Sequence, residues 1–406
     1  MLSFLIAGLV LIIFIEILLH FLVPFIKKDF QWILTKADEY PLINDEKLIK
    51  FLNTNYSEET GWDRKPDTSG FEKNKEYKTF FEISKNGYRE SKNIFNKVKY
   101  LIFGDSFAFC RYVNDNETWE YFLENLIEMN VRNYGVGNFG VDQAIIKYHN
   151  LSDKEDANHI ILSFVPETIL RVHSYWKHYI EFGNIYGFKP KFKYSDNKLE
   201  LLPNVLEKKF TTKDIISKID YIKLNDVFYK QRFLKLMFKF PYIINYFRNF
   251  SRNNIIFLNI LIYKLFKTFK KNDYEIYFEK AWYRIIEDNI SLSHKLYNDK
   301  DFTILMKKII TDFHSKLKEE KKNLSLVIFP QIQDIEASIK NRSCYQKFFK
   351  DLNNEMKVLD LTDYFLNYKD YKSLYLNDSY GGHLSSNGNK FVASIIKKEL
   401  FDINKL

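Results

Sequence analysis

KVKYLIFGDSFAFC, the stretch at Lys97–Cys110, decides how the rest of the chain is interpreted. Its first half is apolar and rich in aromatic and β-branched residues, which favours a β-strand, and Gly104 permits the sharp bend that follows. A serine on such a turn lies at the carboxyl edge of a strand, where open α/β sheets bind their ligands. The stretch therefore predicts a strand followed by a nucleophile at Ser106, and an ordinary loop serine is the alternative.

The segments outward from this stretch alternate between strand and helix patterns. Trp119, Phe122, Leu123 and Leu126 recur at helical spacing after Thr118. Short apolar runs predict further strands, and later periodic segments predict further helices. The predicted elements are a helix at Thr118–Met129, a strand and loop at Val131–Gln143, strands at His159–Val165, Leu324–Phe329 and Met356–Leu361, and helices at Phe302–Lys318 and Asn387–Leu400. This order predicts the α/β class with a parallel sheet.

The N-terminus has the pattern of an uncleaved membrane anchor, which we place at residues 1–28. Leu2–Ile26 is almost continuously apolar, long enough to span a bilayer and longer than the apolar region of a typical signal peptide. Glu16 and His20 share one helix face; we interpret them as side chains that reach toward the membrane surface, and a functional pair is the alternative. The lysines that follow favour a cytoplasmic body, although the sequence leaves the side of the membrane open.

Two regions do not follow the α/β pattern: one precedes it and the other interrupts it. Residues 29–96 are polar and turn-rich, and we interpret them as an approach region with a small edge element at Glu82–Glu90. No glycine lies between Gly187 and Gly381, and this tract is rich in Leu, Ile, Phe and Lys. It therefore predicts a helical insertion at about 190–320. The insertion either rests on a membrane surface or forms core helices with solvated lysine faces.

Composition excludes several classes of protein. Cys110 and Cys344 are isolated, so neither a disulfide framework nor a metal-binding spacing is present, and no metal or organic cofactor is expected. The net charge of +9 is local, because residues 225–272 hold ten Lys and Arg but one acidic residue. Apolar residues interleave with these cations, which favours a membrane surface over nucleic acid. A nucleic-acid binder is the third-ranked hypothesis, and it rests on charge alone.

Three glycine-bearing loops follow the first predicted strand, follow the second, and precede the last helix. In a parallel sheet these loops can converge at the carboxyl edge of the strands. The first loop supplies Ser106, the second supplies backbone amides around 135–140, and the last supplies His383. A serine, a histidine within hydrogen-bond reach and amide donors for an oxyanion are the requirements of serine ester chemistry.

These three blocks resemble the SGNH (GDSL-like) hydrolase superfamily. The first block matches at Phe103–Phe107, the second at Asn133–Gln143 and the third at Gly381–Asn389. The resemblance implies a three-layer α/β/α domain at 97–406, interrupted by the helical insertion, with Ser106 as nucleophile and His383 as base.

The resemblance also assigns the remaining site residues. The oxyanion glycine of the family falls on Asn138 here, beside Gly137. A further family block, just after the strand at His159–Val165, usually has an asparagine, and Glu167 or Thr168 stands in its place here. We therefore expect an oxyanion site at Gly137, Asn138 and Thr168. Tyr380 occupies the position of the family's acid, and the nearby acid that can complete a Ser-His-Asp triad is Asp378; a Ser-His dyad is the alternative.

The resemblance implies acyl-ester hydrolysis or acyl transfer on a glycan or lipid-linked substrate at the membrane, as in surface-polysaccharide pathways. The apolar N-terminal segment predicts a single-pass membrane protein, and we expect its partners to be that substrate and the bilayer. The competing hypothesis is a non-catalytic binding or assembly protein of polysaccharide biosynthesis that keeps the fold. The atypical residues at 167, 168 and 380 favour this alternative.

Overall fold

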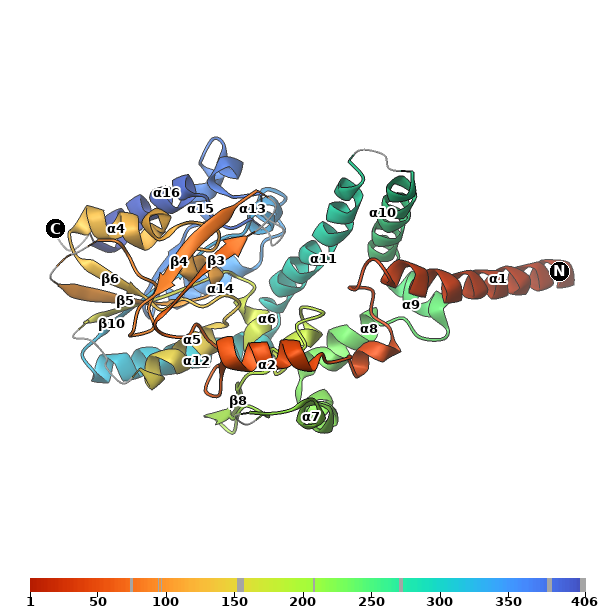
Figure 1. The fold of residues 1–406 in the computed structure, drawn as a ribbon, viewed down its shortest axis with the longest axis horizontal. Coiled ribbons are helices and arrows are strands. Elements are labelled where there is room, and N and C mark those ends of the chain that lie inside the picture. Colours follow the sequence, from red (N-terminus) through yellow and green to blue (C-terminus); the bar gives the residue numbers. More distant parts are fainter. Residues whose placement is uncertain are drawn as a thin grey trace. The chain divides into compact units, whose positions relative to one another are not determined.

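The computed structural model describes residues 1–73, 76–93, 95, 97–151, 157–206, 209–269, 273–377 and 382–401. Its centre is a sheet of five parallel strands (Figure 1). In spatial order the strands are β11 (Lys357–Asp360), β10 (Asn323–Ile328), β7 (His159–Phe164), β5 (Val98–Gly104) and β6 (Asn130–Asn133). All four pairings are parallel, which confirms the predicted sheet.

Helices cover both faces of the sheet. Successive side chains of β5 point to opposite faces, and most of them are buried, so each face needs a covering layer. Tyr100 and Ile102 belong to one core cluster with residues of α4 (Trp119–Ile127) and α16 (Ser386–Ile396). Phe103 faces the other layer, where its ring lies 5.6 Å from Tyr148. That layer includes α5 (Val141–Asn150), α12 (Lys300–Glu319) and α14 (Tyr345–Leu352). The expected three-layer α/β/α architecture is therefore confirmed (Figure 1).

The strand order places a topological switch between β5 and β7. The connection after β5 passes through α4 on one face, whereas the connection into β10 passes through α12 on the other. In open α/β sheets ligands bind outside the carboxyl ends of the strands at such a switch point. Ser106 follows β5 directly, so the fold places it at this position.

Gly104 ends β5 because the neighbouring strand is too close for a side chain. A Cβ atom there would lie 1.7 Å from the carbonyl oxygen of Ser163 on β7. The adjacent Asp105 N–H donates to the same carbonyl at 3.3 Å. The turn before Ser106 is thus held tightly against the next strand.

The approach region contains ordered structure. It includes α2 (Asp45–Thr54), the strand pair β1 (Tyr56–Ser57) and β2 (Gly61–Trp62), and a hairpin of β3 (Thr68–Lys73) and β4 (Lys78–Ile83). Arg89 forms backbone bridges to Ile83 and to Asn133 at the end of β6. The predicted edge element at Glu82–Glu90 therefore links the hairpin to the main sheet.

The helical interpretation of the glycine-free tract was wrong for its first dozen residues. β8 (Lys191–Ser195) and β9 (Lys198–Leu202) form an antiparallel hairpin. Its turn residues Asp196 and Asn197 have φ of 52° and 60°. Asp and Asn tolerate this left-handed region, so the hairpin turn needs no glycine. Helices follow at α7 (Thr212–Asn225), α9 (Tyr242–Arg248), α10 (Phe250–Thr268) and α11 (Glu275–Leu296).

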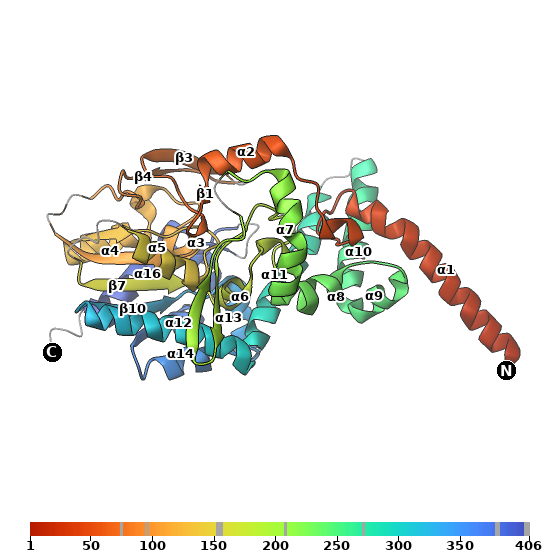
Figure 2. The same cartoon turned by 90° about the horizontal axis from the view of Figure 1, so that it is seen from below.

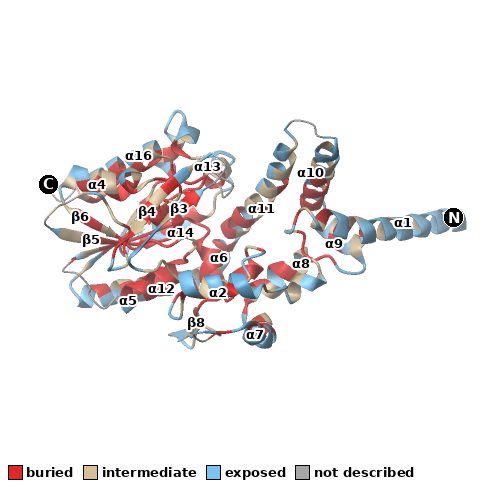
Figure 3. Ribbon diagram, in the orientation of Figure 1, coloured by how far each residue is buried: buried red, intermediate tan, exposed pale blue. Residues whose placement is uncertain are grey.

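The chain divides into two compact units. Unit 2 holds the sheet and comprises Lys50–His173, Lys189–Glu207 and Asn289–Leu406; unit 1 comprises Met1–Ile49, Ser174–Phe188 and Lys208–Asp288. Unit 1 begins with α1 (Leu2–Lys27), which is long and apolar enough to cross a membrane. Figure 3 shows that most of α1 is exposed, whereas the strands are largely buried and their covering helices have both buried and exposed faces.

We predict that Gly104→Ala destabilises the fold and that Gly137→Ala does not. The methyl group at 104 would meet the Ser163 carbonyl, whereas a Cβ at 137 has no atom within 4 Å. Forcing atoms into a filled site costs about 1–3 kcal/mol or more. Chemical denaturation of both variants tests this expectation, and equal free energies of unfolding would contradict it.

Candidate active site

Ser106 and His383, which are 277 residues apart, form a hydrogen bond. The distance between His383 Nε2 and Ser106 Oγ is 2.9 Å. Ser106 is the first residue of the short helix α3 (Ser106–Phe109), and His383 lies in the loop before α16. The imidazole lies against the rings of Phe107 and Tyr112, with centroid distances of 5.1 and 5.7 Å. The structure thus brings together the predicted nucleophile and base.

The His383 loop is fixed by backbone bonds to the preceding segment. The Leu376 N–H donates to the His383 carbonyl at 2.7 Å, and Tyr375 forms an antiparallel bridge with Leu384. Only 4% of the His383 surface and 8% of the Ser106 surface are exposed. The pair therefore lies in a site largely shielded from water. Asp378, the predicted third member of the triad, lies outside the described residues.

Asp105, the middle residue of the Gly-Asp-Ser turn, joins three elements. Its carboxylate accepts from the N–H of Phe107 at 2.9 Å, which caps α3, and from the N–H of Val165 at 3.0 Å. Arg171, on α6 (Thr168–His173), pairs with the same carboxylate at 3.1 Å. Asp105 is fully buried, and these charge-assisted bonds compensate for its desolvation.

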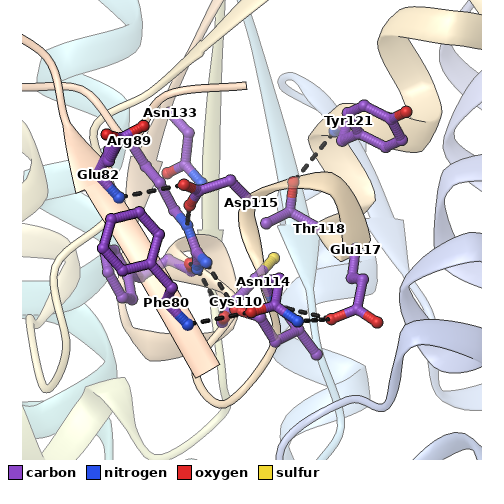
Figure 4. Close-up of polar contacts among 12 residues, drawn as sticks. Phe80, Glu82, Arg89, Cys110, Asn114, Asp115, Glu117, Thr118, Tyr121 and Asn133 are labelled. Atoms are coloured by element: carbon purple, nitrogen blue, oxygen red, sulfur yellow. Dashed lines mark hydrogen bonds and ion pairs between the residues drawn. The ribbon is translucent and has the colours of Figure 1, made fainter. Parts of the chain in front are cut away.

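Arg89 holds the opposite end of α3 (Figure 4). Its guanidinium donates to the carbonyls of Phe109 and Cys110 and, through its other terminal nitrogen, to that of Val113. The charge is balanced by Asp115, whose carboxylate lies 2.8 Å from Arg89 Nε. One buried ion pair therefore fixes three backbone carbonyls at and just after the end of α3. Cations favour the carbonyl end of a helix for the same electrostatic reason.

The second glycine loop lies directly beside α3. A Cβ at Gly135 would lie 2.5 Å from the backbone nitrogen of Phe109, and the Val136 N–H donates to the Gly104 carbonyl at 3.0 Å. Asn133 reinforces this contact, because its side-chain amide donates to the Ala108 carbonyl at 2.8 Å. The loop at 135–140 is thus fixed next to the helix that begins at Ser106, the predicted nucleophile.

Most backbone N–H groups of this loop have an intramolecular acceptor. They are Gly135 (to Asn133 Oδ1), Val136 (to the Gly104 carbonyl), Phe139 (to the Val136 carbonyl) and Gly140 (to Gln143 Oε1). Within the described residues, the N–H groups of Gly137 and Asn138 have no such acceptor. The N–H of Ser106, at the first position of α3, has none either. These three donors are available for an anionic oxygen.

Trp62 orients the peptide between Gly137 and Asn138. Its indole Nε1–H donates to the Gly137 carbonyl at 3.0 Å. In a trans peptide the carbonyl and the following N–H point in opposite directions. The bond therefore directs the Asn138 N–H away from Trp62. Asn138 has φ of 67°, a conformation that asparagine tolerates better than most residues.

The side chain of Thr168 has a different partner from the one expected of an oxyanion donor. Its hydroxyl oxygen accepts from the Val141 N–H at 2.9 Å, and the residue is fully buried. The neighbouring Glu167 pairs with Arg171 at 3.0 Å. Both residues hold the loop and helix in place, and the oxyanion role of Thr168 stays a prediction.

Trp62, Arg89 and Arg171 were missed by the sequence analysis. Arg89 lies in the predicted edge element at Glu82–Glu90, but a single arginine in a turn carries no signal of a distant partner. Trp62 lies in the region interpreted as an approach segment. Trp62 is 75 residues from Gly137, Arg89 is 20 residues from Phe109, and Arg171 is 66 residues from Asp105 along the chain.

Within the described part of the chain, no group of three or more His, Cys, Asp or Glu could hold a metal ion.

Glu120 lies behind α3 with a strongly perturbed carboxyl group. Its Oε1 accepts from the Asn133 amide at 2.8 Å, and the Cys110 thiol donates to Oε2 at 3.3 Å. Complete burial raises the pKa of Glu120 to about 8. The neutral acid is therefore the form that the folded protein favours.

No family model and no curated protein matches this sequence. Similar solved structures include a member of the lipolytic G-D-S-L family from Veillonella parvula, with 11% identity, a TM-score of 0.35, and coverage of 75% of this chain and 99% of that one. Another is a lipolytic protein of the G-D-S-L family from Desulfitobacterium hafniense, with 10% identity, a TM-score of 0.34, and coverage of 74% and 99%. Both structures carry the name of the G-D-S-L family, which is the family that the three sequence blocks resemble.

We predict that Glu120→Gln removes a pH dependence of stability. Because the pKa of Glu120 is higher in the folded protein than the ordinary value of 4.5, the folded state binds the proton more tightly. The wild-type protein therefore loses stability as the pH rises from about 5 to about 8, by on the order of a few kcal/mol from this group. The variant keeps an acceptor for Asn133 but carries no charge.

Urea denaturation of both proteins across this pH range gives the comparison. The difference in free energy of unfolding between variant and wild type should increase with pH. A difference that does not change with pH would contradict the prediction.

Proposed function

We propose that this chain is a serine esterase or acyltransferase, and that α1 anchors it as a single-pass membrane protein. The observation that carries the proposal is the 2.9 Å hydrogen bond between Ser106 and His383. It lies at the switch point of the sheet, beside three backbone N–H groups without an intramolecular acceptor. A nucleophile, a base and oxyanion donors in one site are the parts that acyl chemistry requires.

In the first half-reaction Ser106 Oγ attacks the carbonyl carbon of an ester, and its proton passes to His383 Nε2. The carbonyl oxygen becomes an oxyanion, which accepts from the N–H groups of Ser106, Gly137 and Asn138. When the tetrahedral intermediate collapses, the alcohol leaves with the proton from His383. The acyl group stays on Ser106 as an ester.

In the second half-reaction a hydroxyl group attacks this ester. His383 accepts the proton of the incoming hydroxyl and returns it to Ser106 Oγ as the acyl group departs. Water as the acceptor gives hydrolysis, whereas a sugar hydroxyl gives transfer. Asp378 would orient the imidazole in a triad; without it the pair acts as a dyad.

The proposed substrate is an acylated glycan or a lipid-linked sugar close to the membrane. The apolar length of α1 supports this location, because a spanning helix keeps the protein at the bilayer surface. The resemblance of the three blocks supports an acyl ester as the reacting group. No cofactor is needed for these steps.

A non-catalytic binding protein of polysaccharide biosynthesis is the second candidate. One observation favours it: the side chains at 167 and 168 bind Arg171 and the Val141 N–H, and neither is the asparagine that the family has there. Loss of one oxyanion donor lowers a rate by about 10²–10³-fold. The experiment below separates the two candidates.

We predict that a fluorophosphonate probe labels the full-length protein and that Ser106→Ala abolishes the labelling. The probe forms a bond from Ser106 Oγ to phosphorus and releases fluoride, so it reports an activated serine. Ser394→Ala is the matched control, because this serine is exposed on α16 and bonds only within its own helix. Labelling that persists in Ser106→Ala, or a wild-type protein that is never labelled, would exclude the esterase.

We further predict that Trp62→Phe slows this labelling by about 10-fold or more at unchanged thermal stability. Phenylalanine keeps an aromatic ring but cannot donate to the Gly137 carbonyl, so the Asn138 N–H loses its fixed direction. An imperfectly placed oxyanion donor costs a fraction of the 10²–10³-fold effect of its removal. Second-order labelling rates measure the effect, with Trp282→Phe in α11 as control. Equal rates in Trp62→Phe and wild type would contradict this positioning role.

A further inference from the structure

Glu16, a carboxylate within the apolar helix α1, has two backbone partners. It accepts from the N–H of Tyr242 at 2.7 Å and from the N–H of Ile243 at 2.8 Å. These groups are the first two of α9. Charge within a bilayer is costly unless it is paired with hydrogen-bond donors. The contact therefore satisfies a carboxylate and two helix-terminal donors at the same point, and it fixes the start of α9 to α1.

For a spanning α1, as proposed above, helix geometry gives the depth of this contact in the bilayer. At a rise of about 1.5 Å per residue, Glu16 lies about 21 Å along the axis from Leu2, whereas the hydrocarbon region is about 30 Å thick. If Leu2 lies at one boundary of that region, Glu16 lies about 9 Å inside the other. Lys27 and Lys28 then lie beyond the boundary. The first turn of α9 is thus at the depth of the acyl chains.

The outer face of α9 has the composition that this depth requires. Ile244 and Phe247 are one helical turn apart, and about half of each side chain is exposed (51% and 52%). Phe240 before the helix and Phe250 after it are also exposed. The rings of Phe247 and Phe250 stack with centroids 5.5 Å apart. Together, Phe240, Ile244, Phe247 and Phe250 form a continuous apolar set, which we call the α9 apolar face.

The neighbouring helix α10 packs against the same half of α1. Leu19, Val23 and Ile26 of α1 share a buried cluster with Phe257 and Ile260 of α10. Figures 1 and 2 both show α9 and α10 beside the C-terminal half of α1. The N-terminal half of α1 is exposed, as expected for a segment surrounded by lipid.

Charged residues flank the α9 apolar face at both ends. Lys239 and Arg248 are exposed at the two ends of α9. Lys264 of α10 forms an ion pair with Asp29, just after the end of α1. Long basic side chains can extend from the acyl region to lipid phosphates, and this arrangement is typical of interfacial helices.

We infer that the α9 apolar face inserts into the near leaflet of a phospholipid bilayer, beside the spanning helix α1. Lipid acyl chains cover Phe240, Ile244, Phe247 and Phe250, and the headgroups neutralise Lys239 and Arg248. Glu16 holds the insertion in place through its two bonds to α9. This inference rests on the proposed anchoring by α1. In this arrangement two elements attach unit 1 to the membrane: the spanning helix α1 and the inserted α9 apolar face.

Site-directed spin labelling of the full-length protein in vesicles of phosphatidylcholine and phosphatidylglycerol tests the inference. Cysteines are introduced singly in a Cys344→Ser background at Phe247, at Leu11 in α1, and at Leu224. Leu224 is an exposed apolar residue on α7, which lies apart from α1 in Figures 1 and 2. Oxygen partitions into lipid, whereas a nickel chelate stays in water.

Labels at 247 and 11 should relax at least several-fold more strongly with oxygen than with the nickel chelate, and the label at 224 should show the reverse. A water-exposed label at 11 would overturn the anchoring itself. A lipid-exposed label at 11 with a water-exposed label at 247 would overturn only the present inference. Spin–spin broadening at 247 that disappears on dilution with unlabelled protein would show that a second copy covers the face, which also overturns it.

Glu16→Leu and Glu16→Gln give a second measurement. Leucine offers no acceptor to the two N–H groups of α9, whereas glutamine still offers one carbonyl oxygen. The label at 247 should become more mobile and lose oxygen preference in Glu16→Leu, with a smaller change in Glu16→Gln. An unchanged spectrum in both variants would contradict the role of Glu16.

Discussion

The buried carboxylate of Asp105 is the interaction on which the candidate site depends. It caps the helix that begins at Ser106, binds the end of the adjacent strand, and pairs with Arg171. A carboxylate with no exposed surface is stable only if such donors surround it, so removing one donor would leave the charge uncompensated. The position of Ser106, the proposed nucleophile, thus follows from the electrostatics of the residue before it.

The remaining parts of the site follow from the satisfaction of backbone hydrogen bonds. Arg89 binds carbonyls at the end of α3, and Asn133 binds both Ala108 and the start of the second loop. Buried backbone groups are nearly always paired in folded proteins. The N–H groups at 137 and 138 are therefore informative, because an otherwise satisfied loop leaves them for a ligand.

The sequence predicted the five strands and the helices α4, α12 and α16, because each has a local periodic signal, but it gave no bounds for α5 or α14. It also predicted that Ser106 and His383 lie together, because both lie in glycine-bearing loops that must meet at one edge of a parallel sheet. The Asp196–Asn197 hairpin was missed because absence of glycine was interpreted as helix. Arg89, Arg171 and Trp62 were missed because their roles depend on partners that only the tertiary fold brings near. Asp378 lies outside the described residues and remains a prediction.

The separation of 277 residues between Ser106 and His383 has a consequence for biosynthesis. Ser106 leaves the ribosome well before His383. At about 5–20 residues per second, roughly 14 to 55 s pass between the two. The hydrogen bond between Ser106 and His383 can therefore form only after translation has passed residue 383, and until then the serine lacks its proposed base.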